Sequence, residues 1–385
     1  MRDIIATTSP GVDPLLTSVR RAYALGPFAE AVVSSKKPTI DDVARHCGVA
    51  RTTVSRVLNG GPNVRDEVRQ RVWASVKALD YRVNPQARSL AGGQSRMLAL
   101  IVASDLDAQP NSFYASALEL GALRECLGLG YQLLTRHVAQ DRPNRREQVL
   151  ELIRSQRCQG VMLTPPFADD VELIESIQAL DCHAACISPG GAGRDAADGV
   201  GIDDAAAGAD IARRMIDLGH RRFAFMAGIP GHLAAERRHE GLRGALAAAG
   251  LDPDEVAVVR GDFTFRSGAA LTPQLLEAPT PPTALICAND DMAAGALSVA
   301  HGRGIDVPGR LSITGFDDTP VSEVIWPPLT TVHQPLREMA GEAVRALSGR
   351  IGGDRSPPRF VTLSHAVVER ASAGAPPGAR LRARA

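Results

Sequence analysis

Residues 38–95 read PTIDDVARHCGVARTTVSRVLNGGPNVRDEVRQRVWASVKALDYRVNPQARSLAGGQS. The spacing of apolar residues predicts three short helices, with a helix-turn-helix among them, followed by a small segment that opens at Asn84-Pro85. The stretch is also basic, because residues 36–96 hold 12 Lys and Arg against 5 Asp and Glu. The whole chain has a formal net charge of zero, so the remainder is acidic. A compact basic module joined to a larger acidic body indicates DNA binding by the first and sensing by the second.

Each predicted helix of this module has its own local signals. Thr39 is expected to cap the first helix, with Asp42 as its reciprocal partner. Gly48 permits the tight turn that follows. The second helix, about 50–58, is expected to bury Val54, Val57 and Leu58 and to expose Arg51, Thr52, Ser55 and Arg56. The third is expected to close a small core with Val68, Val72, Val76 and Leu79 around Trp73 and Tyr81.

Length and composition fit a globular protein of two or three domains. The chain has 385 residues, of which 44% are apolar and 22% charged. The N-terminus has no apolar signal-peptide core, and no window approaches 18 uninterrupted apolar residues, so we expect a cytoplasmic protein without a membrane partner. Six scattered cysteines indicate reduced thiols. Cys182, His183 and Cys186 lie in an apolar strand-like run and do not make a tetrahedral site, so neither a metal nor a cofactor is expected.

Between residues 96 and 370 the pattern changes to alternating strands and helices. Apolar runs such as LALIVAS, GVMLT, RFAFMAG and ALICAND alternate with helical stretches at 115–127, 145–155, 205–218 and 236–249. The runs form two sets, 97–188 and 222–316, which predict two doubly wound parallel sheets and an α/β body with a cleft between its lobes. After Leu329 the chain returns through a helix at 335–347. Residues 1–35 and 371–385 are predicted to be a disordered extension and a disordered basic tail.

The run TIDDVARHCGVARTTVSRVLNG resembles, almost position for position, the headpiece of the lactose-repressor (LacI) family of bacterial transcription regulators. NPQARSLAGGQS resembles the family's hinge helix, and the resemblance continues to about residue 370. It implies an all-α headpiece at 36–82, a hinge helix and linker at 83–95, and a bilobed body similar to periplasmic sugar-binding proteins at 96–370. The N-lobe would hold about 96–196 with part of 335–370, and the C-lobe about 197–332. It further implies a homodimer that binds a palindromic operator on the bacterial nucleoid and acts as a repressor.

The resemblance also assigns DNA-binding positions in this sequence. Arg51, Thr52 and Arg56 match the base-reading positions of the recognition helix, whose exposed face Ser55 shares. Thr53 and Asn59 match positions that contact phosphates, and Leu90, with Ala87 beside it, matches the leucine that wedges into the minor groove. The hinge is too short to be stable alone, so it is expected to fold only when two protomers meet on DNA. Ala50 stands where the family usually has a helix-capping serine.

Effector-binding positions follow from the same resemblance. They are Phe113, Tyr114, Arg238, Phe263, Asn289, Asp317 and Gln334, with Asp290 interpreted as a helix cap. Arginine and aspartate can bind neighbouring hydroxyls, asparagine both donates and accepts, and an aromatic ring covers an apolar sugar face, so a sugar is the favoured effector. The alternative effector is a purine or nucleoside that acts as corepressor, because the same residue types suit a nucleobase. His232 lies where purine-responsive relatives carry another arginine, which favours the sugar.

Other functional classes find little support in the sequence. It contains no G-x-S-x-G, Walker loop or H-E-x-x-H motif, so no enzyme is predicted. The run 190–193 is glycine-rich, but the following RDAADG reads as a loop and not as the helix of a nucleotide-binding fold. A solute-binding protein without a DNA role is a remote alternative, which the missing signal peptide and the headpiece oppose. The tail lacks leucine heptads, so a tetramer built on a C-terminal coiled coil is not expected.

Overall fold

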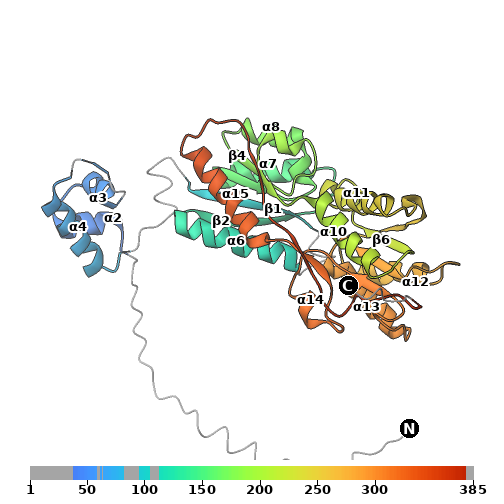
Figure 1. The fold of residues 1–385 in the computed structure, drawn as a ribbon. Coiled ribbons are helices and arrows are strands. Elements are labelled where there is room, and N and C mark those ends of the chain that lie inside the picture. The colour runs from blue at the N-terminus through green and yellow to red at the C-terminus, as the bar shows by residue number, and fades with distance from the viewer. Residues whose placement is uncertain (1–37, 59–60, 63, 82–94, 105–111, 379–385) are drawn as a thin grey trace, which may run out of the picture. The chain divides into compact units, whose positions relative to one another are not determined.

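The computed structural model describes residues 38–58, 61–62, 64–81, 95–104 and 112–378 (Figure 1). Contacts divide the chain into two units, Met1–Ala87 and Arg88–Ala385, which are described separately here as headpiece and body. The predicted hinge helix and its residues Ala87 and Leu90 lie outside the described residues. The same holds for Asn59 and for the predicted disordered extension at 1–35.

The headpiece contains the helices α2 (Ile40–Cys47), α3 (Arg51–Leu58) and α4 (Asp66–Ala78). Thr39 caps α2, its hydroxyl accepting from the main-chain N–H of Asp42, while the Asp42 carboxylate accepts from the N–H of Thr39 in return. Gly48 ends the helix at a φ of 65°, in the left-handed region. These observations confirm the capping and the turn predicted for the first helix.

The headpiece core is aliphatic. Its buried members are Val43, Ala44, Cys47, Val54, Val57, Leu58 and Val72. Val68, Val76, Leu79 and Tyr81 pack against them, as predicted. The prediction for Trp73 is wrong, because its side chain is 49% exposed. Successive residues of a helix point about 100° apart, so when Val72 faces the core its neighbour Trp73 is turned toward solvent.

The first sheet of the body has the strand order β11-β5-β4-β3-β1-β2, with parallel pairing throughout. Its strands are β1 (Met97–Ala103), β2 (Gln132–Val138), β3 (Gly160–Leu163), β4 (His183–Ile187), β5 (Asp198–Gly201) and β11 (Phe360–Thr362). Leu98 and Leu100 pack under α6 (Phe113–Leu129) and α15 (Leu336–Ile351), which lie side by side (Figure 1). The intervening Ala99 and Ile101 pack under α7 (Arg145–Gln156) and α8 (Val171–Gln178). This part is called the N-lobe.

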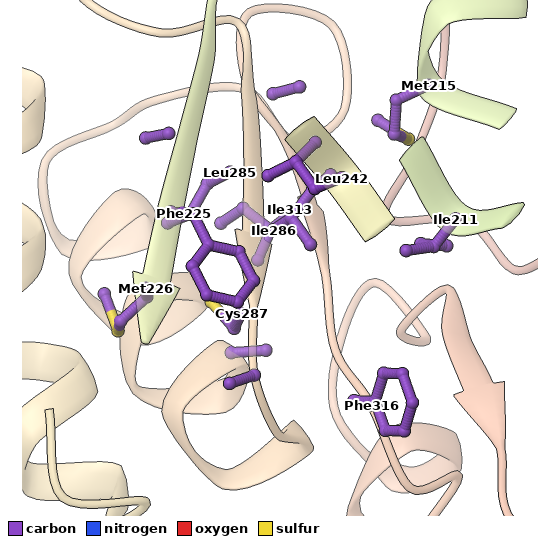
Figure 2. Packing of buried hydrophobic residues seen from close by; sticks show 14 of the residues in the cluster. Ile211, Met215, Phe225, Met226, Leu242, Leu285, Ile286, Cys287, Ile313 and Phe316 are labelled. Atoms are coloured by element: carbon purple, nitrogen blue, oxygen red, sulfur yellow. The ribbon is translucent and has the colours of Figure 1, made fainter. Parts of the chain in front are cut away.

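The second sheet has the order β7-β6-β8-β9 and is also parallel. Its strands are β6 (Phe223–Ala227), β7 (Ala257–Arg260), β8 (Ala284–Cys287) and β9 (Ser312–Thr314). Two helix pairs pack on it, α10 (Asp204–Asp217) with α11 (Leu233–Ala248) and α12 (Phe265–Leu276) with α13 (Asp290–Gly302). Strand residues such as Leu285 and Ile313 meet Leu242 of α11 in one core (Figure 2). This part is called the C-lobe, and the short helices η2 (Phe167–Asp169), η3 (Pro253–Glu255) and α14 (Val321–Val324) complete the two lobes.

The chain passes between the lobes at residues 202–203, 334–335 and 363–365. The last two passages flank a small antiparallel sheet of β10 (Thr331–His333) and β12 (Ala366–Val368). The boundary expected near residue 197 is displaced, because β5 still belongs to the N-lobe sheet. The loop predicted at RDAADG is also wrong, since α9 (Gly193–Ala196) and the start of β5 occupy it. Within the described residues, no helix combines the length and apolar character needed to cross a bilayer.

The tail predicted to be disordered from residue 371 is ordered at its start. Ser372 is fully buried, and its hydroxyl donates to the carbonyl of Ile313 at 2.6 Å and accepts from the N–H of Thr330 at 2.8 Å. The carbonyl of Gly374 accepts from the hydroxyl of Ser312 at 3.1 Å and contacts the buried ring of His220 at 2.9 Å. Residues 372–374, which the composition predicted to be solvated, are therefore hydrogen-bonded to the C-lobe sheet.

Candidate ligand cavity and DNA-binding helix

The α3 helix presents a polar face opposite its apolar one. Arg51, Thr52 and Arg56 are exposed, and Thr53 and Ser55 are half-buried. Position 50 is alanine, so only its carbonyl takes part in the helix start, accepting from the N–H of Thr53 at 2.8 Å. The exposed arginines carry the donors that suit guanine edges in a major groove.

The body contains a cavity of about 320 Å³ that both lobes line. It lies where strands of the two parallel sheets end, because Ala103, Thr164, Ser188 and Asn289 follow or finish β1, β3, β4 and β8. Open parallel sheets bind their ligands at this edge. The polar side chains that line it include Ser104, Ser112, Tyr114, Gln140, Asp141, Thr164, Ser188, His232, Arg238, Asp262, Thr264, Asn289 and Asp317.

The cavity gathers five of the seven predicted effector residues, namely Tyr114, Arg238, Phe263, Asn289 and Asp317. Phe113 does not line it and is 46% exposed, since it is the immediate neighbour of Tyr114 on α6 and points another way. Gln334 does not line it either. Its Nε2 donates to Oδ1 of Asp317 at 2.6 Å, so Gln334 positions the carboxyl group of a cavity residue.

Arg238 lines the cavity and is held on several sides. Its Nε donates to Oδ1 of Asp204 at 2.8 Å, and its Nη1 donates to the carbonyl of Ala288 at 2.7 Å. Nη1 also lies 3.9 Å from Oδ1 of Asp317, and Cζ lies 3.7 Å from the ring centroid of Phe316. Burial raises the pKa of both carboxyl groups, and Arg238 opposes that rise.

Asp204 was not predicted from the sequence. It is the second of two aspartates at a helix start, a pattern that signals capping, and Asp203 is indeed the cap of α10. Its partner Arg238 is on α11, and the two helices approach closely through glycines. A Cβ on Gly208 would lie 2.1 Å from the carbonyl oxygen of Arg238, and one on Gly241 would lie 1.9 Å from that of Ala205. The glycines therefore bring the ion pair within hydrogen-bond distance.

Asn289 lines the cavity as expected, and it also takes the capping role that was expected of Asp290. Asn289 caps α13, its Oδ1 accepting from the N–H of Met292 at 3.1 Å, while its Nδ2 donates to the carbonyl of Phe263 at 2.9 Å. Asp290 is not the cap. It is buried and accepts from the N–H of Thr319 at 2.7 Å and the hydroxyl of Thr331 at 2.6 Å. These hydrogen bonds tie Asp290 to the segment after β9 rather than to the helix start. Burial raises the pKa of its carboxyl group to about 7.

Phe263 and His232 form the aromatic wall of the cavity, with ring centroids 4.8 Å apart. Phe263 has a φ of 68°, and its ring lies so close to Gly228 that a Cβ there would clash with Cζ at 1.9 Å. His232 caps α11 with Nδ1, which accepts from the N–H of Ala235 at 3.3 Å. Burial and the charge of Arg238 lower its pKa to about 3, so the ring is neutral and carries its proton on Nε2.

Several hydroxyl groups of the N-lobe wall were also missed. Thr164 donates to the carbonyl of Ile101 at 3.1 Å and Ser188 has a φ of 51°, and both follow buried strands. A polar residue directly after a strand was the signal that could have found them. Burial raises the pKa of the Tyr114 hydroxyl, which therefore stays protonated as a donor.

Burial keeps two cysteine thiols of the body protonated. Cys182 and Cys186 are both buried in the N-lobe, and burial raises the pKa of each thiol to about 12. Among residues that the structure describes, no group of three or more His, Cys, Asp or Glu is arranged to hold a metal ion.

Comparisons with known proteins agree with both parts of the chain. The family described as bacterial regulatory proteins, lacI family, matches residues 39–84, and the periplasmic binding protein-like domain matches 212–373. The HTH-type transcriptional regulator CelR of Thermobifida fusca is 34% identical over 340 residues, which cover 86% of this chain and 98% of that protein.

Solved structures show the same likeness in three dimensions. A CelR–cellobiose complex is 31% identical with a TM-score of 0.67, over 87% of this chain and 99% of that one. The lac repressor dimer bound to operator and the anti-inducer ONPF is 26% identical with a TM-score of 0.76, over 88% and 100%. The chain therefore belongs to the LacI family of DNA-binding transcriptional regulators.

Proposed function

We propose that this regulator is a repressor whose binding to a palindromic operator is controlled by a sugar in the cavity. The observation that carries the proposal is the cavity itself, in which an aromatic wall faces hydroxyl, amide and guanidinium groups at the ends of two parallel sheets. Such a mixture of one apolar face and many hydrogen-bonding groups suits a ring bearing hydroxyl groups. The likeness to a relative solved with cellobiose supports the same ligand class.

In the headpiece, Arg51, Thr52 and Arg56 of α3 would contact base edges, with Ser55 on the same face and Thr53 and Asn59 at phosphates. Ala87 and Leu90 would act in the hinge, where an apolar wedge in the minor groove kinks the duplex. Two copies of the chain would place two such helices in successive major grooves.

The homodimer is supported by the surface of α6. Phe113, Leu120, Leu123 and Leu127 recur at helical spacing on this helix and are 46%, 53%, 40% and 70% exposed. A continuous apolar stripe on a body helix is suited to pairing with a second copy across a twofold axis. Ligand that changes the angle between the lobes, through the three passages between them, would shift the paired N-lobes and so favour or oppose hinge folding.

The test begins with an operator selected by the full-length protein from a random duplex library. Thermal shift against pentoses, hexoses, disaccharides and purines would find the ligand, and an operator titration would give its effect. We expect a sugar that raises the melting temperature and weakens operator binding. A purine that binds and tightens operator binding would instead support the corepressor alternative, for which Phe263, Arg238 and Asp317 also provide suitable groups.

Variants separate sensing from DNA binding. Phe263→Ala should abolish the sugar response and keep operator binding, because Phe263 lines the cavity and the headpiece is untouched. Phe265→Ala is the matched control, since Phe265 is close in sequence but is 49% exposed and does not line the cavity. Equal loss of response in both variants would contradict the role assigned to the cavity.

A further inference from the structure

The charge of Arg238 is already balanced within the protein. Asp204 accepts from its Nε, Asp317 lies 3.9 Å from its Nη1, and all three side chains are buried. A guanidinium stays protonated at any pH at which the protein is folded, so the pair Arg238–Asp204 is an ion pair with no net charge. Among the described residues that line the cavity, Arg238 is the one Lys or Arg, and the acidic side chains are Asp141, Asp262 and Asp317.

Helix N-termini would be the alternative anion sites, because their free N–H groups attract phosphate and carboxylate. The caps of α6, α11, α12 and α13 all line the cavity, and in each helix the cap side chain accepts from an N–H group of the first turn. Ser112, His232, Thr264 and Asn289 accept from the N–H groups of Ala115, Ala235, Ser267 and Met292. Each cap side chain therefore competes with an anion for one N–H group of its helix, and α13 carries Asp290 and Asp291 in its first turn.

We infer that the cavity selects an uncharged polyhydroxylated ligand and rejects the phosphorylated or carboxylated form of the same molecule. This inference rests on the proposed function and adds the ligand's charge to it. A phosphate monoester brings nearly two negative charges at neutral pH, and here it would meet carboxylates at the rim and no uncommitted cation among the described lining residues. Burying such a group without a partner is strongly unfavourable.

A neutral ring finds suitable partners instead. Thr164, Ser188 and the Tyr114 hydroxyl offer donors and acceptors from the N-lobe. His232 offers its Nε2 proton from the C-lobe, and Phe263 covers an apolar ring face. The volume of about 320 Å³ is at the small end of the range for ligand cavities, roughly 300–1,000 Å³, which fits a mono- or disaccharide.

The experiment is isothermal titration of the full-length protein with matched sets of ligands. These are glucose with glucose 6-phosphate and glucuronate, ribose with ribose 5-phosphate, and cellobiose with cellobiose 6′-phosphate, all at pH 7.5 and low salt. We expect every anionic form to bind at least a hundredfold more weakly than its neutral parent. A phosphorylated or carboxylated form that binds as tightly as its parent would overturn the inference and leave the proposed sugar-controlled function standing. Binding of a purine and of no sugar in the thermal-shift panel would overturn both.

Rim variants give a second measurement. Asp141→Asn combined with Asp262→Asn removes two carboxyl groups from the cavity lining. The affinity for the neutral sugar divided by the affinity for its phosphate should then fall several-fold at low salt. The control combines Asp254→Asn with Glu255→Gln, which removes the same charge from the exposed surface of η3 outside the cavity. An equal fall of this ratio in the control would mean that the net charge of the protein causes the preference for the neutral sugar, and would overturn the inference.

Discussion

Nε of Arg238 lies 2.8 Å from Oδ1 of Asp204, and the two side chains are only 5% and 3% exposed. This ion pair joins α11 to α10 at the cavity lining, and Asp204 balances the charge of Arg238. Buried pairs of this kind contribute little compared with apolar residues of the same size, but breaking one leaves an uncompensated charge. Arg238 therefore has two roles, because it lines the cavity and also holds α10 to α11 in the C-lobe.

Arg238→Met should destabilise the body by about 3–5 kcal/mol, because Asp204 is left buried without its partner. Adding Asp204→Leu should restore much of that loss. Urea unfolding followed by circular dichroism measures both, with Arg243→Met as control on the same helix. Arg243 pairs with Asp254 near the surface, so its loss should cost about 0–1 kcal/mol. A double variant no more stable than Arg238→Met alone would contradict the explanation.

Gly208→Ala should separate α10 from α11, because its Cβ would lie 2.1 Å from the carbonyl oxygen of Arg238. Overpacking of this kind costs about 1–3 kcal/mol. We expect a lower melting temperature and a smaller stabilisation by sugar. Gly244→Ala is the control, since that position on α11 is exposed and has nothing within 4 Å of a Cβ. There the substitution should stabilise the helix by about 0.5–1 kcal/mol.

Acid should destabilise the body through His232. Burial and Arg238 lower its pKa to about 3, whereas an unfolded histidine titrates near 6.5. Between these values the unfolded chain binds the additional proton, so stability is full above about pH 6.5 and falls as the pH decreases toward 3. His232→Gln should make the decline of melting temperature from pH 7 to pH 5 shallower. Identical slopes for the two proteins would show that the ring is not held neutral.

The headpiece was predictable because its signals are local. Thr39 with Asp42 and Gly48 with Val49 mark a helix end and a turn through bonds within a few residues. The position of Trp73 was not predictable from its size, because the buried stripe of α4 runs through Val72 and Ser75 and leaves Trp73 on the exposed side. A single step along a helix decides which side chain faces the core.

In the body, contacts between residues far apart in the sequence determine the features that could not be predicted. β5 reads DGVG and lacks the apolar run of its neighbours, since Gly199 makes room for the ring of Phe360. The adjacent pairs Phe113–Tyr114 and Asn289–Asp290 each contain one cavity residue, and only the orientation of α6 and α13 selects it. Ser372 becomes ordered through contacts with Ile313 and Thr330, far away in the sequence.

The recognition helix gives the prediction that bears most directly on DNA binding. Arg51→Ala and Arg56→Ala each remove an exposed guanidinium from α3. If these side chains read base edges, each change should weaken operator binding by about 1–3 kcal/mol and relax the preference at one base pair. Arg71→Ala removes the same charge from the exposed surface of α4, so it should lower operator and random-duplex affinity equally. Fluorescence anisotropy with operator and random duplexes at two salt concentrations measures both effects. Equal losses on the two duplexes for Arg51→Ala and Arg56→Ala would assign these residues to the phosphate backbone instead.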